Sequence, residues 1–249
     1  RSRVCFMLGR IRYENEKYKH ALTWYDEVKE KDLIPQERLE FLYTKAYSLL
    51  GMKKYAEAKK IFNSLSNEKN EYSNVATYYS AYIDYLQKNN KSALNGFLKI
   101  EETEEYKDIV PYYIVQIYYE EKEYKKSLEH GKKMLESNPN NKNNSEVYRI
   151  MGECAYRENV FNEAIVYFGK YEKLAKKLQR NSSYMYGMSF FQEKDYVNAV
   201  KYLTRATTPE DSIAQNAYLH LGHSYLLQND KNNARMAFEA ASKTDFSKQ

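Results

Sequence analysis

The chain has 249 residues, and its 39 basic and 34 acidic residues give a formal net charge of +5. The two signs are interspersed along the sequence, which argues against the one-sided basic surface of a nucleic-acid or membrane binder. Eight Gly and four Pro are too few for a sheet protein rich in tight turns, and no run of about 18 apolar residues predicts a membrane-spanning helix.

Small residues recur along the chain in one local context. They are Ala21, Ala58, Ala93, Ser127, Ala164, Ala199 and Ala234, spaced 34 to 37 residues apart. Four positions after them stand Tyr25, Phe62, Phe97, Gly131, Phe168, Leu203 and Phe238, which are bulky with one exception. Twelve positions before them stand Gly9, Ala46, Ala81, Val115, Gly152, Gly187 and Gly222. A period near 35 residues predicts helical units that must stack in order to bury their apolar faces.

Within each unit, apolar residues three and four positions apart predict two helices joined by a short polar turn. The clearest example is the stretch from Tyr148 to Tyr171, in which Gly152 and Ala164 would let the two helices approach closely. In chain order, the seven repeats are predicted at residues 3–31, 38–67, 74–102, 109–138, 145–176, 180–207 and 213–243. Helix breaks are expected at residues 33–35, 67–73, 101–108, 138–145 and 207–212.

This pattern resembles the tetratricopeptide repeat (TPR), which has small residues at two helix crossings and an aromatic residue in the turn between the helices. The turn aromatic is present as Tyr18, Tyr55, Tyr124, Phe161 and Tyr196, whereas Asn90 and Lys231 replace it in repeats three and seven. The resemblance covers about Arg3 to Phe246. It implies an all-α fold, a right-handed superhelical α-solenoid of about seven helix-turn-helix repeats forming one domain over residues 1–249.

The fourth repeat departs from the pattern at Val115, Ser127 and Gly131. A Gly inside a helix costs about 1 kcal/mol relative to Ala, and the missing aromatic side chain removes packing as well. One hypothesis is that this repeat is a hinge in the array. The alternative is ordinary divergence that is compensated by Tyr112 or Tyr113.

The two ends of the chain predict a fragment of a longer protein. The chain opens at Arg1, without an initiator Met or a signal-like apolar stretch. Its last predicted helix carries Met236 and Phe238 and is followed by no polar capping helix, which solenoids normally have. Either more chain follows, or this face mediates end-to-end self-association.

No catalytic motif or cofactor-binding motif is found, so the chain is predicted to be non-enzymatic and to need no cofactor or metal. His220 and His223 have metal-compatible spacing, but no third ligand is evident nearby. Cys5 and Cys154 are interpreted as small buried residues rather than a disulfide. The lysine doublets, including Lys176–Lys177, mostly lie on second helices and are interpreted as a solubility surface.

In the TPR family, the first helices line a concave groove, and groove positions recur at fixed offsets. Transferred to this sequence, these offsets give a predicted partner-binding set: Tyr43, Tyr47, Tyr78, Tyr82, Tyr85, Tyr112, Gln116, Tyr119, Arg149, Tyr156, Tyr184 and Phe191. A Tyr ring combines a rigid apolar body with a hydroxyl, which suits a surface that binds protein side chains. The alternative is that these rings pack on one another and only line the array.

The leading hypothesis is therefore a protein-interaction scaffold whose groove takes an amphipathic or aromatic peptide segment. The alternatives are a spacer or oligomerisation segment of a larger envelope assembly protein, and single-stranded nucleic acid stacked on the tyrosines. The groove positions between Glu40 and Glu120 include no Lys or Arg, which disfavours nucleic acid. A loose resemblance to bacterial cell-envelope TPR proteins implies the periplasm or cell envelope rather than the cytoplasm.

Overall fold

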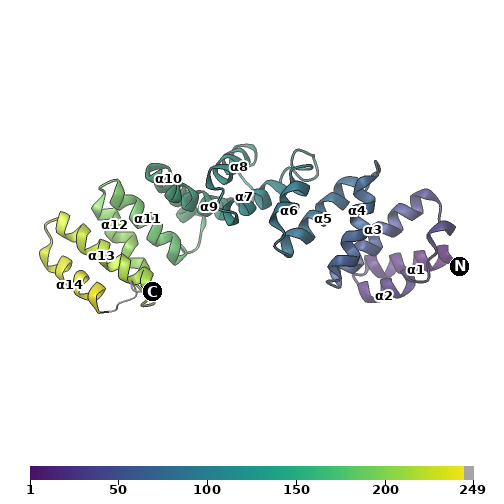
Figure 1. Cartoon of the computed structure of the whole chain (residues 1–249), viewed down its shortest axis with the longest axis horizontal. Helices are drawn as coiled ribbons and strands as arrows, with labels where there is room; N and C mark the ends of the chain where they lie inside the picture. The colour runs from purple at the N-terminus through teal and green to yellow at the C-terminus, as the bar shows by residue number, and fades with distance from the viewer. Residues whose placement is uncertain (244–249) are drawn as a thin grey trace. The chain divides into compact units, whose positions relative to one another are not determined.

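The computed structural model describes residues 1–243, and in this range it contains fourteen α-helices, two short 3₁₀ turns and no strand (Figure 1). The all-α prediction is thus confirmed. Residues 244–246, the end of the predicted repeat span, lie outside the described residues. The chain divides into two compact units, Arg1–Val110 (unit 1) and Pro111–Gln249 (unit 2), and each unit is described by itself.

Unit 1 is built from three pairs of helices that follow one another in space as they do in sequence. They are α1 (Ser2–Glu14), α2 (Tyr18–Tyr25), α3 (Pro35–Gly51), α4 (Tyr55–Asn67), α5 (Ser73–Leu86) and α6 (Asn90–Phe97), with the 3₁₀ turn η1 (Glu30–Asp32) after α2. Each helix packs on the next, and α1 also packs on α3. Tyr25, Phe41, Phe62 and Leu65 are fully buried between them and form the centre of the core.

Unit 2 is built from helical pairs of the same kind. Its helices are α7 (Val110–Glu120), α8 (Tyr124–Ser137), α9 (Asn144–Arg157), α10 (Phe161–Leu174), α11 (Arg180–Gln192), α12 (Tyr196–Leu203), α13 (Ser212–Leu227) and α14 (Lys231–Ser242), with the 3₁₀ turn η2 (Thr204–Ala206) after α12. The first helices α9, α11 and α13 pack in a row, and the second helices α10 and α12 each pack against the first helices on both sides. This stacking of helical pairs places the same face of every first helix on one side of the unit.

Each predicted repeat contains one such pair, but the second helices differ in length. Helices α2, α6 and α12 have 8 residues, whereas α4, α8, α10 and α14 have 12 to 14. None of the described helices is long and apolar enough to cross a bilayer. That the array forms a single domain over residues 1–249 stays a prediction.

The small residues at the helix crossings have a direct steric cause. A Cβ atom added to Gly152 of α9 would lie 2.6 Å from Cδ1 of Phe168, the buried aromatic residue of α10. The same relation holds between Gly222 and Phe238, where the distance would be 2.5 Å. The glycine and the bulky residue sixteen positions later therefore form one contact, which explains why both recur with the same period.

The fourth repeat fills its irregular positions in a different way. The side chain of Met151, from the first helix of the next repeat, occupies the space beside Gly131, where an added Cβ would lie 2.9 Å from its sulfur. The hydroxyl of Ser127 donates a hydrogen bond to the carbonyl oxygen of Val115, at 3.0 Å. Tyr112 packs against the same cluster as Met151. These contacts fill the positions at which the repeat departs from the pattern. A hinge in this repeat and its alternative, compensated divergence, both stay predictions.

The turn within each pair has a backbone feature that sequence reasoning did not anticipate. Within residues 1–243, seven non-glycine residues have positive φ angles, and each lies five positions before the small residue of its repeat: Glu16, Lys53, Lys88, Lys122, Asn159, Lys194 and Asn229. At Lys53, the amide donates to the carbonyl of Leu50, and the next amide donates to Leu49. This is the Schellman arrangement, which satisfies the last carbonyl groups of the first helix.

Candidate peptide-binding surface

The twelve residues predicted to bind a partner lie on five first helices at three repeated offsets. The offsets are three positions before, one after and four after the crossing residue, as in Tyr78, Tyr82 and Tyr85 around Ala81 of α5. All twelve side chains are half-buried. Tyr43 and Tyr47 lie on α3, the next three on α5, and the remaining seven on α7, α9 and α11 of unit 2.

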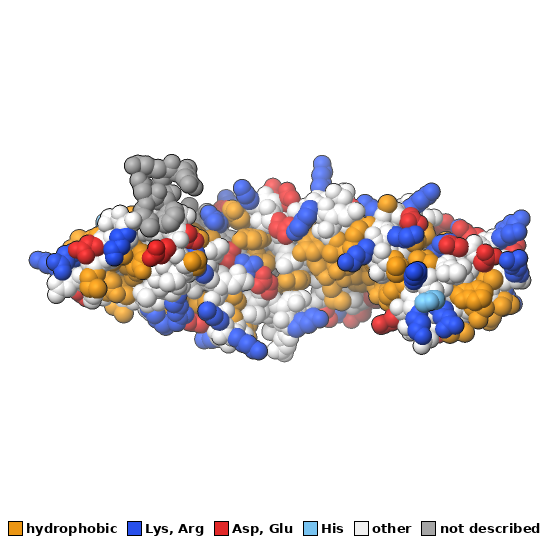
Figure 2. All heavy atoms as spheres, turned by 90° about the horizontal axis from the view of Figure 1, so that it is seen from below, with side chains coloured by type: hydrophobic (Ala, Val, Ile, Leu, Met, Phe, Trp, Pro, Cys, Tyr) orange, Lys and Arg blue, Asp and Glu red, His pale blue; other side chains and the backbone are white. Residues whose placement is uncertain are grey.

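In unit 1, the predicted tyrosines belong to a continuous series of ring contacts, which we call the tyrosine strip. It consists of Tyr13, Tyr43, Tyr47, Tyr78, Tyr79 and Tyr82. The rings of Tyr13 and Tyr47 meet edge to face at 5.6 Å, and those of Tyr47 and Tyr79 at 5.1 Å. Tyr78 contacts Tyr79 at 5.1 Å and lies parallel to Tyr82 at 6.0 Å. Figure 2 shows a patch of apolar side chains in the part of the molecule that holds α3 to α6.

Several members of this surface were not among the predicted residues. Tyr79 lies between the two predicted groups and also stacks on the buried ring of Phe62, at 5.4 Å. Tyr72 contacts Tyr43 at 5.1 Å, and Tyr106 stacks on Tyr78 at 4.8 Å. Tyr72 immediately precedes α5 and Tyr106 lies in the connector after α6, where the helical offsets do not apply. The richness in tyrosine was the only sequence signal for them.

Burial shapes the chemistry of the strip. Desolvation raises the pKa of the Tyr43 and Tyr79 hydroxyls well above their ordinary value, and neighbouring tyrosines raise the pKa further. These hydroxyls are therefore protonated at neutral pH, and hydrogen bonds join Tyr43 to Tyr13 and Tyr79, and Tyr79 to Tyr47. The strip is thus a surface of rigid rings that can contact apolar side chains, with bonded hydroxyl groups among them.

Unit 2 carries a charged network at the corresponding positions. Arg149 donates to both carboxylate oxygens of Glu146, at 2.6 and 3.0 Å, and to Glu153 at 2.7 Å. Glu153 is only 3% exposed. It also accepts hydrogen bonds from the hydroxyl of Tyr119 on α7 and from the hydroxyl of Ser182 on α11, at 2.9 Å. The network thus joins the first helices of three consecutive repeats.

The ionisation of this network follows from its geometry. Burial acts to lower the pKa of Arg149, but the ion pairs with Glu146 and Glu153 outweigh it and raise the pKa. Burial and the neighbouring Glu153 carboxylate raise the pKa of Tyr119 to about 12. Arg149 was predicted as a partner-binding residue, but its guanidinium group is occupied by the two carboxylates of its own helix.

The other predicted residues of unit 2 mostly make apolar contacts. The rings of Tyr156 and Phe161 are 5.9 Å apart, and Phe191 lies 5.8 Å from Tyr196. Tyr184 packs on the two hydrophobic clusters that join α9, α11 and α13. The side chain of Gln116 donates to the Tyr112 hydroxyl at 2.8 Å. The side chains of this surface are half-buried and already contact other residues of the same unit.

The histidine pair and the two cysteines were the other candidate sites in the sequence. Within residues 1–243, no cluster of three His, Cys, Asp or Glu side chains could hold a metal ion. His220 contacts Phe191 at 5.0 Å and His223 at 6.3 Å. Both cysteines are buried and free, and burial raises the pKa of the Cys154 thiol to about 12. A reactive thiol would need a lowered pKa, so Cys154 is a packing residue.

Phe238, which the sequence analysis placed at an interaction surface, packs inside its own repeat. Its ring covers Gly222 and meets His223 edge to face at 5.2 Å. Met236, on the same helix, is 62% exposed. A test of self-association through α14 would therefore change Met236 rather than Phe238. Self-association itself stays a prediction.

Comparison with known proteins supports the fold. A family model described as a tetratricopeptide repeat matches residues 215–247. No curated protein matches the sequence. A solved structure of the C-terminal part of a TPR repeat-containing protein from Cytophaga hutchinsonii has 14% identity and a TM-score of 0.66, and the match covers 95% of this chain and 93% of that one.

Two further solved structures share the fold over a shorter span. A structure of MamA from AMB-1 has 13% identity and a TM-score of 0.61, with 72% of this chain and 96% of that chain covered. YrrB, described as a TPR protein with an unusual peptide-binding site, has 16% identity and a TM-score of 0.59, with 72% and 90% covered. The chain therefore shares the helical solenoid fold of these tetratricopeptide repeat structures, and its last repeat matches the tetratricopeptide repeat model.

Proposed function

We propose that the chain is a non-enzymatic interaction scaffold that binds an amphipathic or aromatic peptide segment of a partner protein on the tyrosine strip of unit 1. The observation that carries this proposal is the continuity of the strip. Six half-buried rings from three first helices contact one another without a break. Contiguous exposed aromatic surface on proteins usually marks a contact site.

The packing of the strip favours binding in energetic terms. Each ring is held by its neighbours, so a partner would immobilise little that is not already fixed, and the entropy cost of binding is small. An aromatic contact contributes roughly 0.5–1.5 kcal/mol beyond its buried area. Three or four such contacts, added to burial of the partner's apolar side chains, are consistent with a micromolar Kd.

The residues of the strip carry no positive charge, and this limits the type of partner. Some TPR proteins hold a C-terminal carboxylate with a basic clamp on successive first helices. None of the six residues of the strip is basic, and none of the five predicted residues in unit 1 is either. We therefore expect recognition through apolar and aromatic side chains within a segment, not through a chain terminus.

The proposal can be tested with peptides selected on the protein itself. A phage library of random 16-residue peptides would be panned on the whole chain, and a selected peptide would be labelled and titrated by fluorescence polarisation. We expect aromatic and amphipathic sequences to be enriched. Tyr78→Ala with Tyr82→Ala should weaken binding of such a peptide at least tenfold, because this change removes two adjoining rings, and with them one end of the strip.

A matched control removes exposed apolar surface elsewhere. Val166 and Val197, on second helices, are exposed, so Val166→Ala with Val197→Ala should leave the affinity within twofold. Trp24, the single tryptophan, lies in unit 1, and its fluorescence would verify that the tyrosine variant remains folded. Equal binding by a folded tyrosine variant and by the original chain would show that the strip is not the binding surface.

A further inference from the structure

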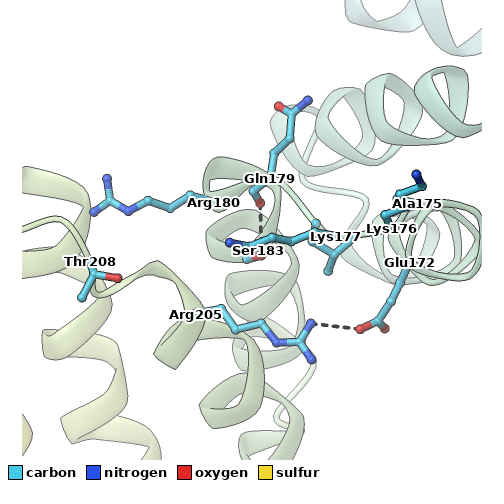
Figure 3. A pocket seen from close by; sticks show the side chains of 10 residues that line it. Glu172, Ala175, Lys176, Lys177, Gln179, Arg180, Ser183, Arg205 and Thr208 are labelled. Carbon is cyan, nitrogen blue, oxygen red and sulfur yellow. Dashed lines mark hydrogen bonds and ion pairs between the residues drawn. The ribbon is translucent and has the colours of Figure 1, made fainter.

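Unit 2 contains a cleft that is separate from the predicted groove residues. Its volume is about 800 Å³, and it lies between the end of α10, the connector to α11, and the connector that follows α12 (Figure 3). The residues that matter for its charge are Glu172, Lys176, Lys177, Arg180 and Arg205. Four of these five side chains are basic, which is unusual in a chain whose charges are otherwise interspersed.

Two of the basic side chains are committed to structural ion pairs. Arg180 binds both carboxylate oxygens of Asp211, at 2.6 and 2.7 Å, and also donates to the carbonyl oxygens of Ala206 and Pro209. In Figure 3 it points away from the other labelled side chains, toward the connector that carries Thr208. Its charge is therefore largely neutralised, and its role is to hold the connector in place.

The carboxylate of Glu172 would repel an acidic ligand if it were free. It accepts a hydrogen bond from Arg205 at 2.9 Å and one from the Tyr202 hydroxyl at 2.6 Å. Although burial acts to raise the pKa of Glu172, these two partners lower it below its ordinary value, so the group stays ionised and paired. Glu172 and Arg205 thus cancel each other within the wall of the cleft.

Two lysines remain. Lys176 and Lys177 are exposed, and no ion pair engages either side chain among the described residues. This doublet was interpreted from the sequence together with the lysines of second helices, but it lies in the connector beyond the end of α10. Helix α11 begins next to it, and its N-cap residue Gln179 makes no side-chain cap. The uncapped amide groups add to the positive potential of the two lysines.

From this arrangement we propose that the cleft binds an acidic segment of a protein partner, through Lys176 and Lys177 at its rim. The cleft is larger than a single phosphate group needs, and two flexible ammonium groups suit carboxylates at variable positions better than a fixed bidentate ligand. A nucleic-acid backbone would need a longer track of cations than one doublet. The site is independent of the tyrosine strip, so either proposal can fail without the other.

The test uses a fluorescein-labelled hexaglutamate peptide, titrated against the whole chain by fluorescence polarisation at 50 and 300 mM NaCl. Lys176→Gln with Lys177→Gln should weaken binding at least tenfold at the lower salt concentration. The control, Lys125→Gln with Lys126→Gln, removes the same charge from α8 of the same unit and should weaken binding less than twofold. Binding to the original chain should also weaken at the higher salt concentration.

Three results would overturn the proposal. The first is equal weakening by the two lysine pairs, which would indicate attraction by net charge only. The second is equal binding of a hexaglutamine peptide, or no binding of hexaglutamate at all. The third is tighter binding of a labelled twelve-nucleotide oligo-dT that is lost in the Lys176→Gln, Lys177→Gln variant, which would assign the cleft to nucleic acid.

Discussion

The two units use the same offsets of the repeat for opposite chemistry. Three positions before the crossing residue and one position after it, α3 carries Tyr43 and Tyr47, whereas α9 carries Arg149 and Glu153. In unit 1 these side chains contact other rings, and their hydroxyl groups interact with the hydroxyl groups of neighbouring tyrosines. In unit 2 they form a closed ion-pair network in which Glu153 is buried.

This difference shows how a solenoid separates stability from surface chemistry. The crossing positions, such as Gly9 and Gly152, serve the same steric purpose in both units. The adjacent offsets face away from the crossing and are free to vary, as long as each buried polar group finds a partner. A partner of unit 1 would therefore meet apolar rings. In unit 2, by contrast, Arg149, Glu146 and Glu153 are paired with one another, so their charges stabilise the unit itself.

The largest expected effect is on the charged network. Glu153→Ala would leave Arg149 with only Glu146 as a partner and would remove the acceptor of the Tyr119 and Ser182 hydroxyls. Removal of one partner of a buried ion pair typically costs about 3–5 kcal/mol. At the same offset in unit 1, Tyr47→Phe removes only a hydroxyl and should cost about 1 kcal/mol. Urea unfolding followed by far-UV circular dichroism would measure both.

A double variant distinguishes lost charge pairing from lost shape. Arg149→Met with Glu153→Leu removes both charges and keeps the volume apolar, so it should recover most of the stability that Glu153→Ala loses. If Glu153→Ala costs less than about 1 kcal/mol, the network is not a structural element of unit 2, and the contrast between the units disappears.

The next largest effect concerns the steric contact at the helix crossings, which both units contain. Gly152→Ala gains about 1 kcal/mol in helix propensity but forces its new methyl group against the buried ring of Phe168. Overpacking of this kind costs about 1–3 kcal/mol, so the net result should be a loss of stability. Gly9→Ala in unit 1 meets Tyr25 in the same way and should lose a similar amount.

Gly169 provides the matched control for these substitutions. It lies on α10, and an added Cβ would meet only the hydroxyl of Tyr186, at 3.3 Å. Gly169→Ala should therefore be neutral or stabilising by up to about 1 kcal/mol. Thermal melting of the three variants gives the comparison, and a stabilised Gly152→Ala would contradict the steric explanation of the repeat.

The smallest expected effect is a decrease in the stability of unit 2 at acid pH. Burial lowers the pKa of His220 below its ordinary value of 6.5, and His223 lowers it further. As the pH falls below 6.5, the unfolded chain binds a proton that the folded chain binds less readily, so stability decreases. The melting temperature of unit 2 should be lower at about pH 5.5 than at about pH 7.5, and His220→Phe should remove part of this decrease.

The control for this experiment lies in the other unit. His20 lies on α2 of unit 1, so His20→Phe should leave the pH dependence of unit 2 unchanged. Circular dichroism reports on both units, whereas Trp24 fluorescence reports on unit 1 only. If His220→Phe and the original chain lose equal stability between the two pH values, then His220 does not contribute to the acid sensitivity of unit 2.

The recurrence of small and bulky residues was sufficient to predict the helical pairs and the all-α fold. This is because the contact between Gly152 and Phe168 depends on sterics within one repeat, and a fixed spacing of sixteen residues records it directly. The offsets also located the half-buried faces of the first helices. They could not locate Tyr72 or Tyr106, because residues outside helices carry no periodic signal.

The repeating frame of paired helices is encoded in the order of residues, since most of the helix crossings need a small residue. The surroundings of that frame depend on contacts between repeats, which appear only in the folded protein. The tertiary structure placed Met151 beside Gly131, closed the Arg149–Glu153 network across three repeats, and brought Lys176 and Lys177 to a cleft whose other charges are paired. Those outcomes depend on side chains from different repeats meeting in space, and such meetings leave no fixed spacing in the chain.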